Sequence, residues 1–598
     1  MSFPGFDDRI CAMEHNMILS ASGWRRIFAY TGDEQDMTPD IGEKNSALAS
    51  VAAGVFFDWL AVRTGIQSPV IAVGTDTRPT GPQIADAVTR TLASRGAVIQ
   101  YTGVTAAPEI MAFARKLDGF IYISASHNPV GHNGIKFGLN DGGVLEASEN
   151  AELVREFERR LSDDSDIAAE VSAAASCPRS LLDGIRDSSG SAKHNALRAY
   201  REFMNLTVSG TTDTGMRSRF FRMISDGAAG TGIICDFNGS ARTLSIDRDY
   251  FSDLGIRFYG INTAPGGIAH GIIPEAENLV WTAREMERLR AAGHDDVILG
   301  YMPDCDGDRG NLVYWDPERN SAEVLKAQEV FALSVLSELG WSVIQNSGDD
   351  GFRPAVAVNC PTSMRIDEIA RTLGAEVFRA EVGETNVVNL ARRKRAEGWN
   401  VRILGEGSNG GTITYPSSVR DPMNTVFAVL KLLLIRERGP YRLWCERSGR
   451  EFRPDYTLGD ITASLPQYTT TGVSEPGAVL RIRTADHSVL KSNFQKVFEE
   501  EWKTSAVRER FGLADWECAV TKGTEEIRGV RDFSVSGRGG LKLIFKDADG
   551  IPCAFIWMRG SGTEPVFRIM CDVRGDRPDM EDSLLAWETE MLRRADSM

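Results

Sequence analysis

The chain has 598 residues, of which 67 are basic and 83 acidic, so its formal net charge is −16. This length predicts roughly three to five domains, and shares of 42% apolar and 25% charged residues exclude a small stapled scaffold, a disordered chain and a fibrous repeat. The negative charge argues against a nucleic-acid partner. A small anion can still bind, because a pocket needs only a few Arg, Lys and backbone N–H groups.

The nine cysteines are spread along the chain, are odd in number and form no C-x-x-C pair. We therefore expect neither a disulfide framework nor a zinc ribbon, and a reducing cytoplasm fits best. The longest apolar run, 426–435, is interrupted by Lys431 and is far shorter than the roughly 20 residues of a membrane-spanning helix. The first ten residues lack the basic and apolar regions of a signal peptide. No membrane partner is expected.

The first predicted domain, 1–192, alternates between helical and strand-like sequence. Helices are expected over 43–64, from Thr80 and before 120, and strands over 70–76, 97–104 and 120–124. This is a βαβ alternation with buried strands. A stretch rich in Ser, Ala and Asp, 162–193, interrupts the alternation, so a domain boundary is placed near 192.

Two further predicted domains, 193–322 and 323–452, repeat the alternation. In the second, an excursion near 208–232 reads as a surface insertion; the third ends with a long helix after Arg420. The last domain, 453–598, is rich in strands and ends with a helix from Pro578. The fold class is therefore α/β, with three tandem α/β domains that contain mixed sheets and a C-terminal α+β domain.

In each α/β domain one apolar strand runs directly into a polar, Gly-rich loop. These loops are 124–134, 303–310 and 405–411, and the last domain offers 559–565. Loops at the carboxyl ends of strands are where open α/β sheets bind ligands. Each loop alone also fits an ordinary turn.

The loop 303–310 places carboxylates at Asp304, Asp306 and Asp308. Three oxygen ligands at this spacing can converge on Mg²⁺ or Ca²⁺. An EF-hand is excluded, because Arg309 stands where that loop needs Gly and Trp315 where it needs Glu. The alternative is a solvated acidic turn, in which three like charges would repel one another.

The other loops suit phosphate and sugar groups. Ser126 precedes His127, but neighbours in sequence seldom form a Ser/His dyad, whereas Lys136 could act as a base or pair with phosphate. In 559–565 two glycines free backbone N–H groups, and Arg559 offers a planar fork, so this loop is a phosphate cradle or a hairpin turn. Glu406 and Ser408 suit polyol recognition or a turn cap.

Together, SASHNP, DCDGDR, GEGSNGG and RGSGTEP resemble the phosphoserine, metal, sugar and phosphate loops of the α-D-phosphohexomutase superfamily. They occur in the family's order, one in each predicted domain. Weaker similarities are SGWRR (22–26), GTDTRPT (74–80) and AEVGETN (380–386). The resemblance thus covers nearly the whole chain, apart from parts of 162–193 and 208–232.

The resemblance implies four domains around a central cleft and a reversible phosphoryl shift between the 1- and 6-positions of a hexose phosphate. Phosphorylated Ser126 would donate to the sugar, and hexose 1,6-bisphosphate would be both intermediate and activator. Mg²⁺ would be held by Asp304, Asp306, Asp308 and an oxygen on Ser126. The catalytic set is Ser126, Lys136, Arg25 and His127. The substrate-binding set is Arg309, Gly383, Glu384, Glu406, Ser408, Arg559, Ser561, Gly562, Thr563 and Arg568.

Some positions depart from the family pattern. Arg26 stands where Gly is usual, Asn409 and Gly410 exclude a His base found in some members, and Asp-Pro follows Arg420 in place of Asp-Gly.

Glucose and mannose phosphates are the expected substrates, and phosphoglucosamine mutase is the alternative. Two other readings are a haloacid-dehalogenase-like enzyme with Asp304 as nucleophile and a catalytically silent sugar-phosphate-binding protein. The oligomeric state is left open.

Overall fold

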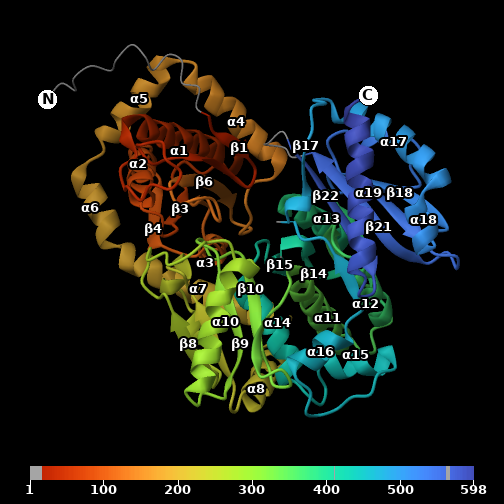
Figure 1. Cartoon of the computed structure of the whole chain (residues 1–598). Coiled ribbons are helices and arrows are strands. Elements are labelled where there is room, and N and C mark those ends of the chain that lie inside the picture. The colour runs from red at the N-terminus through yellow and green to blue at the C-terminus, as the bar shows by residue number, and fades with distance from the viewer. Residues whose placement is uncertain (1–15, 410, 474, 561–565) are drawn as a thin grey trace. The chain divides into compact units, whose positions relative to one another are not determined.

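The computed structural model describes residues 16–598 except 410, 474 and 561–565, with the backbone alone at Asn409. The chain divides into two compact units. Unit 1 comprises Met1–Val324 and Pro416–Asn424, and unit 2 comprises Leu325–Tyr415 and Thr425–Met598. Each unit contains two sheets (Figure 1).

The first sheet of unit 1 has six strands in the order β1-β2-β6-β5-β3-β4. Strand β3 runs parallel to β4 and β5, and β6 runs antiparallel to β5 and β2. The strands are β1 (Ile18–Ser20), β2 (Gly23–Ile27), β3 (Val70–Thr75), β4 (Val98–Val104), β5 (Gly119–Ile123) and β6 (His132–Leu139). The sheet is therefore mixed, as expected.

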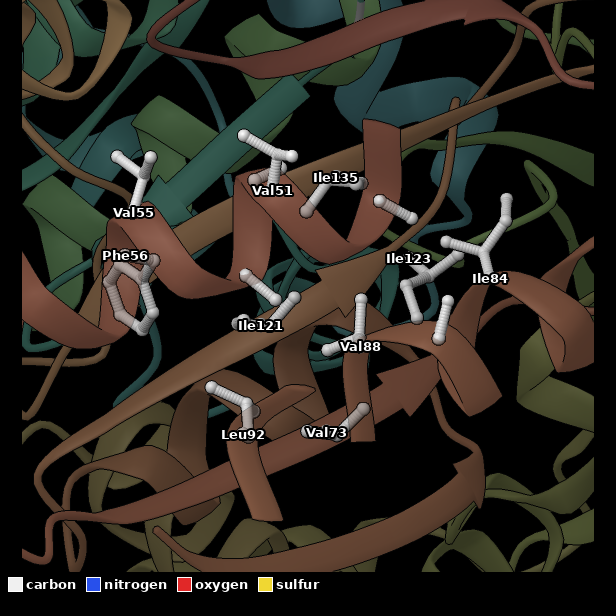
Figure 2. Packing of buried hydrophobic residues seen from close by; sticks show 14 of the residues in the cluster. Val51, Val55, Phe56, Val73, Ile84, Val88, Leu92, Ile121, Ile123 and Ile135 are labelled. Carbon is white, nitrogen blue, oxygen red and sulfur yellow. The ribbon is translucent and has the colours of Figure 1, made fainter. Parts of the chain in front are cut away.

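Helix α1 (Gly42–Thr64) and helix α2 (Gly81–Ser94) cover one face of this sheet. Val51, Val55 and Phe56 of α1 pack over the β5 and β6 side chains, among them Ile121 and Ile135 (Figure 2). Of the described helices, α1 alone is long and apolar enough to cross a membrane, but most of it is buried in this core. Its apolar composition is therefore explained by packing. Helices α3 (Ala107–Ala114), α4 (Ala147–Leu161), α5 (Asp164–Ala175), α6 (Arg179–Asp187) and α7 (Ser189–Ser209) complete the region.

The second sheet of unit 1 has the order β11-β10-β9-β7-β8. Strands β7, β8 and β9 run parallel to one another, and β10 runs antiparallel to β9 and to β11. The elements are α8 (Thr214–Gly227), β7 (Gly232–Asp236), η2 (Ala241–Leu244), α9 (Asp247–Asp253), β8 (Arg257–Ile261), α10 (Ala276–Ala291), β9 (Val297–Pro303), β10 (Gly310–Asp316) and β11 (Ser321–Val324).

Unit 2 holds a mixed four-stranded sheet, β13-β12-β14-β15, that follows the expected alternation closely. Its elements are α11 (Ala327–Gln345), β12 (Pro354–Asn359), α12 (Arg365–Leu373), β13 (Glu376–Ala380), α13 (Glu384–Ala396), β14 (Asn400–Glu406), η3 (Gly407–Asn409), β15 (Gly411–Thr414), α14 (Pro422–Leu434) and α15 (Pro440–Ser448). The division between the units falls inside α14, after Asn424.

The last sheet pairs its strands antiparallel in the order β16-β22-β21-β20-β18-β19, with β17 also on β22. Its elements are α16 (Leu458–Ser464), β16 (Tyr468–Thr470), η4 (Pro476–Ala478), β17 (Val479–Arg481), α17 (His487–Thr504), α18 (Ala506–Phe511), β18 (Asp515–Lys522), β19 (Glu525–Arg528), η5 (Phe533–Ser536), β20 (Leu541–Lys546), β21 (Pro552–Gly560), β22 (Val566–Arg574) and α19 (Pro578–Asp596). Helices α17 and α19 pack on one face.

The α/β fold class with mixed sheets is confirmed. The division into four domains stays a prediction, and two features bear on its boundaries. Helix α7 runs across residue 192, and residues 416–424 pack with unit 1. The stretch 162–193 and the excursion near 208–232 are largely helical, because α5, α6, α7 and α8 occupy them.

Candidate active site

Ser126 lies in the loop between β5 and β6 and is buried. Its φ is +54°, a left-handed conformation that costs energy in a residue other than Gly and that often marks functional sites. The hydroxyl Oγ donates to Asp304 Oδ2 over 2.6 Å, and the backbone N–H donates to Ser124 Oγ over 2.8 Å. The fold therefore brings together two loops that are 178 residues apart in the sequence.

Arg78 fixes the backbone of this loop. Its guanidinium is fully buried, and Nε donates to Asp76 Oδ2 over 3.1 Å. The other four N–H groups meet backbone carbonyls, those of Ser126 (2.7 Å), Asn128 (2.6 Å), Pro129 (2.5 Å) and His132 (3.1 Å). All five donors of the side chain are thus used, so Arg78 positions the Ser126 loop.

Asp304, Asp306 and Asp308 converge in the loop between β9 and β10. One carboxylate oxygen from each lies within 4.8 Å of the others, and all three residues are buried. Asp306 Oδ1 has no hydrogen-bond partner among the described residues. A buried acceptor without a donor is costly, and three hard oxygen ligands with one orphaned oxygen fit a divalent cation such as Mg²⁺.

Basic side chains of unit 1 surround the carboxylates. Lys136 Nζ lies 2.7 Å from Asp306 Oδ2, and Arg420 Nη2 lies 3.3 Å from Asp308 Oδ2. The Nε atoms of Arg25 and Arg309 are buried without a hydrogen-bond partner among the residues described. Such donors suit an anion, and a phosphoryl group would supply the acceptors.

The charges in the cluster shift one another's protonation. Burial, with Asp306 and Asp308 nearby, raises the pKa of Asp304 well above its usual range. Burial acts to raise the pKa of Asp306 as well, but Lys136 outweighs it and the pKa falls. Conversely, burial would lower the pKa of Lys136, yet Asp306 and Asp308 raise it. Lys136 is therefore a cation at neutral pH, which favours pairing with phosphate over a role as base.

His127 is neutral at physiological pH. Burial, reinforced by Arg309 and Arg25, lowers the pKa of its imidazole to about 2. Its Nδ1 lies 3.4 Å from Ser126 Oγ, at the outer limit of a hydrogen bond. The two neighbours thus approach one another more closely than we expect for adjacent residues.

A buried network supports the acidic loop. Arg242 donates to the Gly307 carbonyl over 3.2 Å and pairs with Asp247 at 2.8 Å and Asp421 at 3.3 Å. Tyr200 of α7 donates to Asp421 over 2.6 Å. Residues from α7, the 241–247 segment and the 416–424 segment therefore hold the metal loop and Arg420 in place.

In unit 2, the predicted sugar-binding residues partly converge. Glu406, at the end of β14, accepts hydrogen bonds from the Gly383 N–H over 2.9 Å and from Asn359 Nδ2 over 3.0 Å. Gly383 has φ +124°, which a side chain would disfavour, and Glu384 begins α13 directly after it. Ser408 lies in η3, two residues beyond Glu406.

The predicted phosphate residues of unit 2 lie on β21 and β22. Arg559 and Arg568 are cross-strand partners, so their side chains leave the same face of the sheet. Arg559 Nε lies 3.0 Å from Glu381 Oε1, although the N–H is not aligned as a hydrogen bond. Arg568 Nη1 donates to the Val473 carbonyl over 3.2 Å. Ser561, Gly562 and Thr563 lie outside the described residues.

The structure thus groups Ser126, Lys136, Arg25, His127, Arg309 and the three aspartates in unit 1. Arg78, Arg420 and Glu381 contact residues of the site, but the sequence alone predicts no site role for them. Arg78 lies within GTDTRPT, which was noted only as a weak similarity, and Arg420 precedes a noted departure. For Glu381 the only signal was its place in AEVGETN.

Two sequence profiles match the chain. Residues 33–163 match "Phosphoglucomutase/phosphomannomutase, alpha/beta/alpha domain I", and residues 339–448 match domain III of the same family. A phosphoglucomutase/phosphomannomutase from Thermococcus kodakarensis is 24% identical over 92% of this chain and 93% of its own length. A phosphoglucosamine mutase from Methanococcus vannielii is 24% identical over 53% of this chain and 60% of its own length.

The fold is similar to that of the Paramecium phosphoglucomutase pp63/parafusin in its open form. The TM-score is 0.59 at 14% identity, with 97% of this chain and 95% of that chain covered. The two matching domain profiles, the near full-length relative and the shared fold agree with the four loops. These comparisons support the α-D-phosphohexomutase superfamily for this chain, and the relatives named here are phosphomutases, enzymes of the isomerase/phosphotransferase class.

Proposed function

We propose that this enzyme interconverts hexose 1-phosphate and hexose 6-phosphate through phosphorylated Ser126. The observation that carries the proposal is the strained, buried Ser126, whose Oγ lies 2.6 Å from Asp304 in a cluster of three aspartates and several cations. Phosphoryl transfer depends mainly on positioning and on neutralising charge. Both are what this cluster provides.

In the first step, the bond between phosphorus and Ser126 Oγ breaks and a bond to a sugar hydroxyl oxygen forms, giving hexose 1,6-bisphosphate. The sugar hydroxyl loses its proton in this step, and Ser126 Oγ gains one as it leaves. After the bisphosphate reverses its orientation, the other phosphoryl group returns to Ser126. Arg78 holds the loop backbone so that Oγ keeps one position through both transfers. Lys136 supplies a fixed positive charge beside Asp306, and Arg25 and Arg309 offer buried N–H donors to the phosphoryl oxygens.

Asp304, Asp306 and Asp308 would hold Mg²⁺, with an oxygen on phosphorylated Ser126 completing the site. The bound cation would neutralise charge on the phosphoryl oxygens. Lys136 and Arg420, which contact Asp306 and Asp308, hold these carboxylates in position. His127, neutral and close to Oγ, serves as a hydrogen-bonding group in this arrangement.

The residues of unit 2 would recognise the rest of the substrate. Glu406 and Ser408 are placed to bind two ring hydroxyls, with Gly383 and Glu384 beside them. Arg559, Arg568 and the loop residues Ser561, Gly562 and Thr563 would bind the phosphate that is not transferred. Glu381 Oε1 lies 3.0 Å from Arg559 Nε, so a phosphate bound by Arg559 would compete with this carboxylate.

The substrate is proposed to be glucose or mannose phosphate, with glucosamine phosphate as the second candidate because a phosphoglucosamine mutase is also a relative. Assays of glucose 1-phosphate, mannose 1-phosphate and glucosamine 1-phosphate, each with Mg²⁺ and the matching 1,6-bisphosphate, would identify it. We expect turnover of at least one sugar. Folded protein that converts none of them would contradict the proposal.

The eight cysteines of the described part are all free, which agrees with the reducing cytoplasm in which we place the enzyme.

A further inference from the structure

A cavity of about 460 Å³ lies in unit 1 beside the start of α1, and one residue of its lining, Arg25, is also assigned to phosphoryl transfer. It is bordered by β1, β2 and the first turn of α1, and its polar lining includes Arg26, Lys44, Asn45 and His132. Ligand pockets typically have volumes of about 300 to 1,000 Å³, so the cavity can accept a small metabolite.

Arg26 and the aspartate cluster lie on opposite faces of the sheet. Side chains alternate along a strand, and Trp24 on β2 and Ile135 on β6 belong to the core beneath α1 (Figure 2 shows Ile135). Arg26 is two residues from Trp24 and shares its face. Arg25 and Lys136 lie on the other face, where Lys136 meets Asp306. Arg25 also borders the cavity, but its side chain belongs to the transfer cluster.

The cavity is rich in donors and positive charge. Arg26 Nε donates to its neighbour's carbonyl at Ile27, whereas its Nη1 is buried and has no partner among the residues described. Burial lowers the pKa of this guanidinium. Lys44 and the N-terminal turn of α1 add positive charge. Glu43 is the single acidic residue in the lining.

Asn45 supplies an independent sign of a missing ligand. It is 7% exposed and borders the cavity, and its Nδ2 donates to the Phe28 carbonyl over 3.1 Å. This bond fixes the orientation of the amide, because the opposite orientation would place two acceptors together. Its Oδ1 is then left buried without a donor in the described structure. A ligand that completes the site must therefore bring a hydrogen-bond donor as well as a negative charge.

We propose that this cavity is a second binding site, for a small anion that carries a hydroxyl or amine donor. The anionic group would lie against Arg26, Lys44 and the first turn of α1, and its donor would reach Asn45 Oδ1. The inference does not depend on the proposed reaction, because Arg26, Lys44 and Asn45 have no contact with the aspartate cluster among the described residues.

The test is isothermal titration of the full chain with sn-glycerol 3-phosphate, which offers a phosphate and hydroxyl donors. Arg26→Gln removes a charge-assisted hydrogen bond, so we expect affinity to fall at least tenfold. Lys44→Glu reverses an exposed charge at the same cavity and should weaken binding similarly, and it decides the question if Arg26→Gln does not fold. Arg63→Gln, at the far end of α1 and 47% exposed, is the matched control and should bind like wild type.

Two outcomes would overturn the proposal. Binding that persists in Arg26→Gln and Lys44→Glu but is lost in Arg309→Gln would place the probe among the transfer residues. Sulfate that binds as tightly as sn-glycerol 3-phosphate would show that Asn45 Oδ1 receives no donor, since sulfate has none to offer at neutral pH. We expect sulfate to bind several-fold more weakly, and we expect Arg26→Gln to retain mutase activity within about twofold in the absence of the probe.

Discussion

The substitution Arg78→Lys tests whether a single buried guanidinium fixes the loop that carries Ser126. It keeps the positive charge opposite Asp76, so the buried ion pair is not simply broken. Lysine has three N–H donors where arginine has five. At least two of the five acceptors around Arg78, four of them loop carbonyls, therefore lose their partner.

Each buried acceptor left unsatisfied costs about 1 to 3 kcal/mol. Because the acceptors share one donor group and their losses are not additive, we expect the loop to be destabilised by about 2 to 4 kcal/mol. This corresponds to local opening that is roughly 30- to 1,000-fold more frequent. A nucleophile whose position is no longer fixed should also lose about 100-fold in kcat.

Hydrogen–deuterium exchange of peptides that cover 120–135 measures the opening directly, and a mutase assay gives kcat. Arg90→Lys is the matched control, because Arg90 lies on α2, is partly exposed and pairs with Asp86. It should change neither quantity appreciably. If Arg78→Lys leaves both the exchange of this loop and kcat at wild-type values, the loop is held by something other than Arg78.

Three further predictions follow from the charges. Burial raises the pKa of Glu588 well above its usual range, so the stability that this residue contributes should be lost as pH rises above about 4.5. The urea midpoint of the wild type, relative to that of Glu588→Gln, should therefore fall between pH 5 and 8, and an equal change in the two proteins would refute this. Glu381→Gln removes the carboxylate beside Arg559, so KM for the sugar phosphate should fall about 1.5- to 5-fold, whereas a higher KM would indicate that the carboxylate helps binding. Chelation with EDTA should abolish turnover and Mg²⁺ should restore it; full activity after exhaustive chelation would remove the metal from the account.

The alternation of apolar strands and helices was predictable because buried parallel strands read as short apolar runs. The strand expected over 70–76 illustrates this, since β3 covers Val70–Thr75. The helix expected from Pro578 also begins where it was predicted. The stretch 162–193 was harder to predict, because its Ser and Asp content is typical of loops. In the structure α5 packs against α1 and α2, and this tertiary packing outweighs the weak local preference.

The motif residues of the site were predictable because loops at strand ends carry their chemistry in sequence. The residues that hold these motifs in place were not predictable. Arg78 acts through backbone carbonyls, which leave no trace in the identity of the residues that provide them. Arg420 reaches Asp308 across 112 residues, and Tyr200 reaches Asp421 across 221, so only the folded chain reveals these pairs.

The central claim is that Ser126 carries the phosphoryl group. Incubation of the protein with glucose 1,6-bisphosphate and Mg²⁺, followed by mass spectrometry of the peptide that contains 124–134, tests it most directly. The account predicts one phosphate on Ser126, which disappears when glucose 1-phosphate or glucose 6-phosphate is added in excess. Phosphate found on Asp304 and not on Ser126 would contradict it and favour an aspartyl-phosphate mechanism.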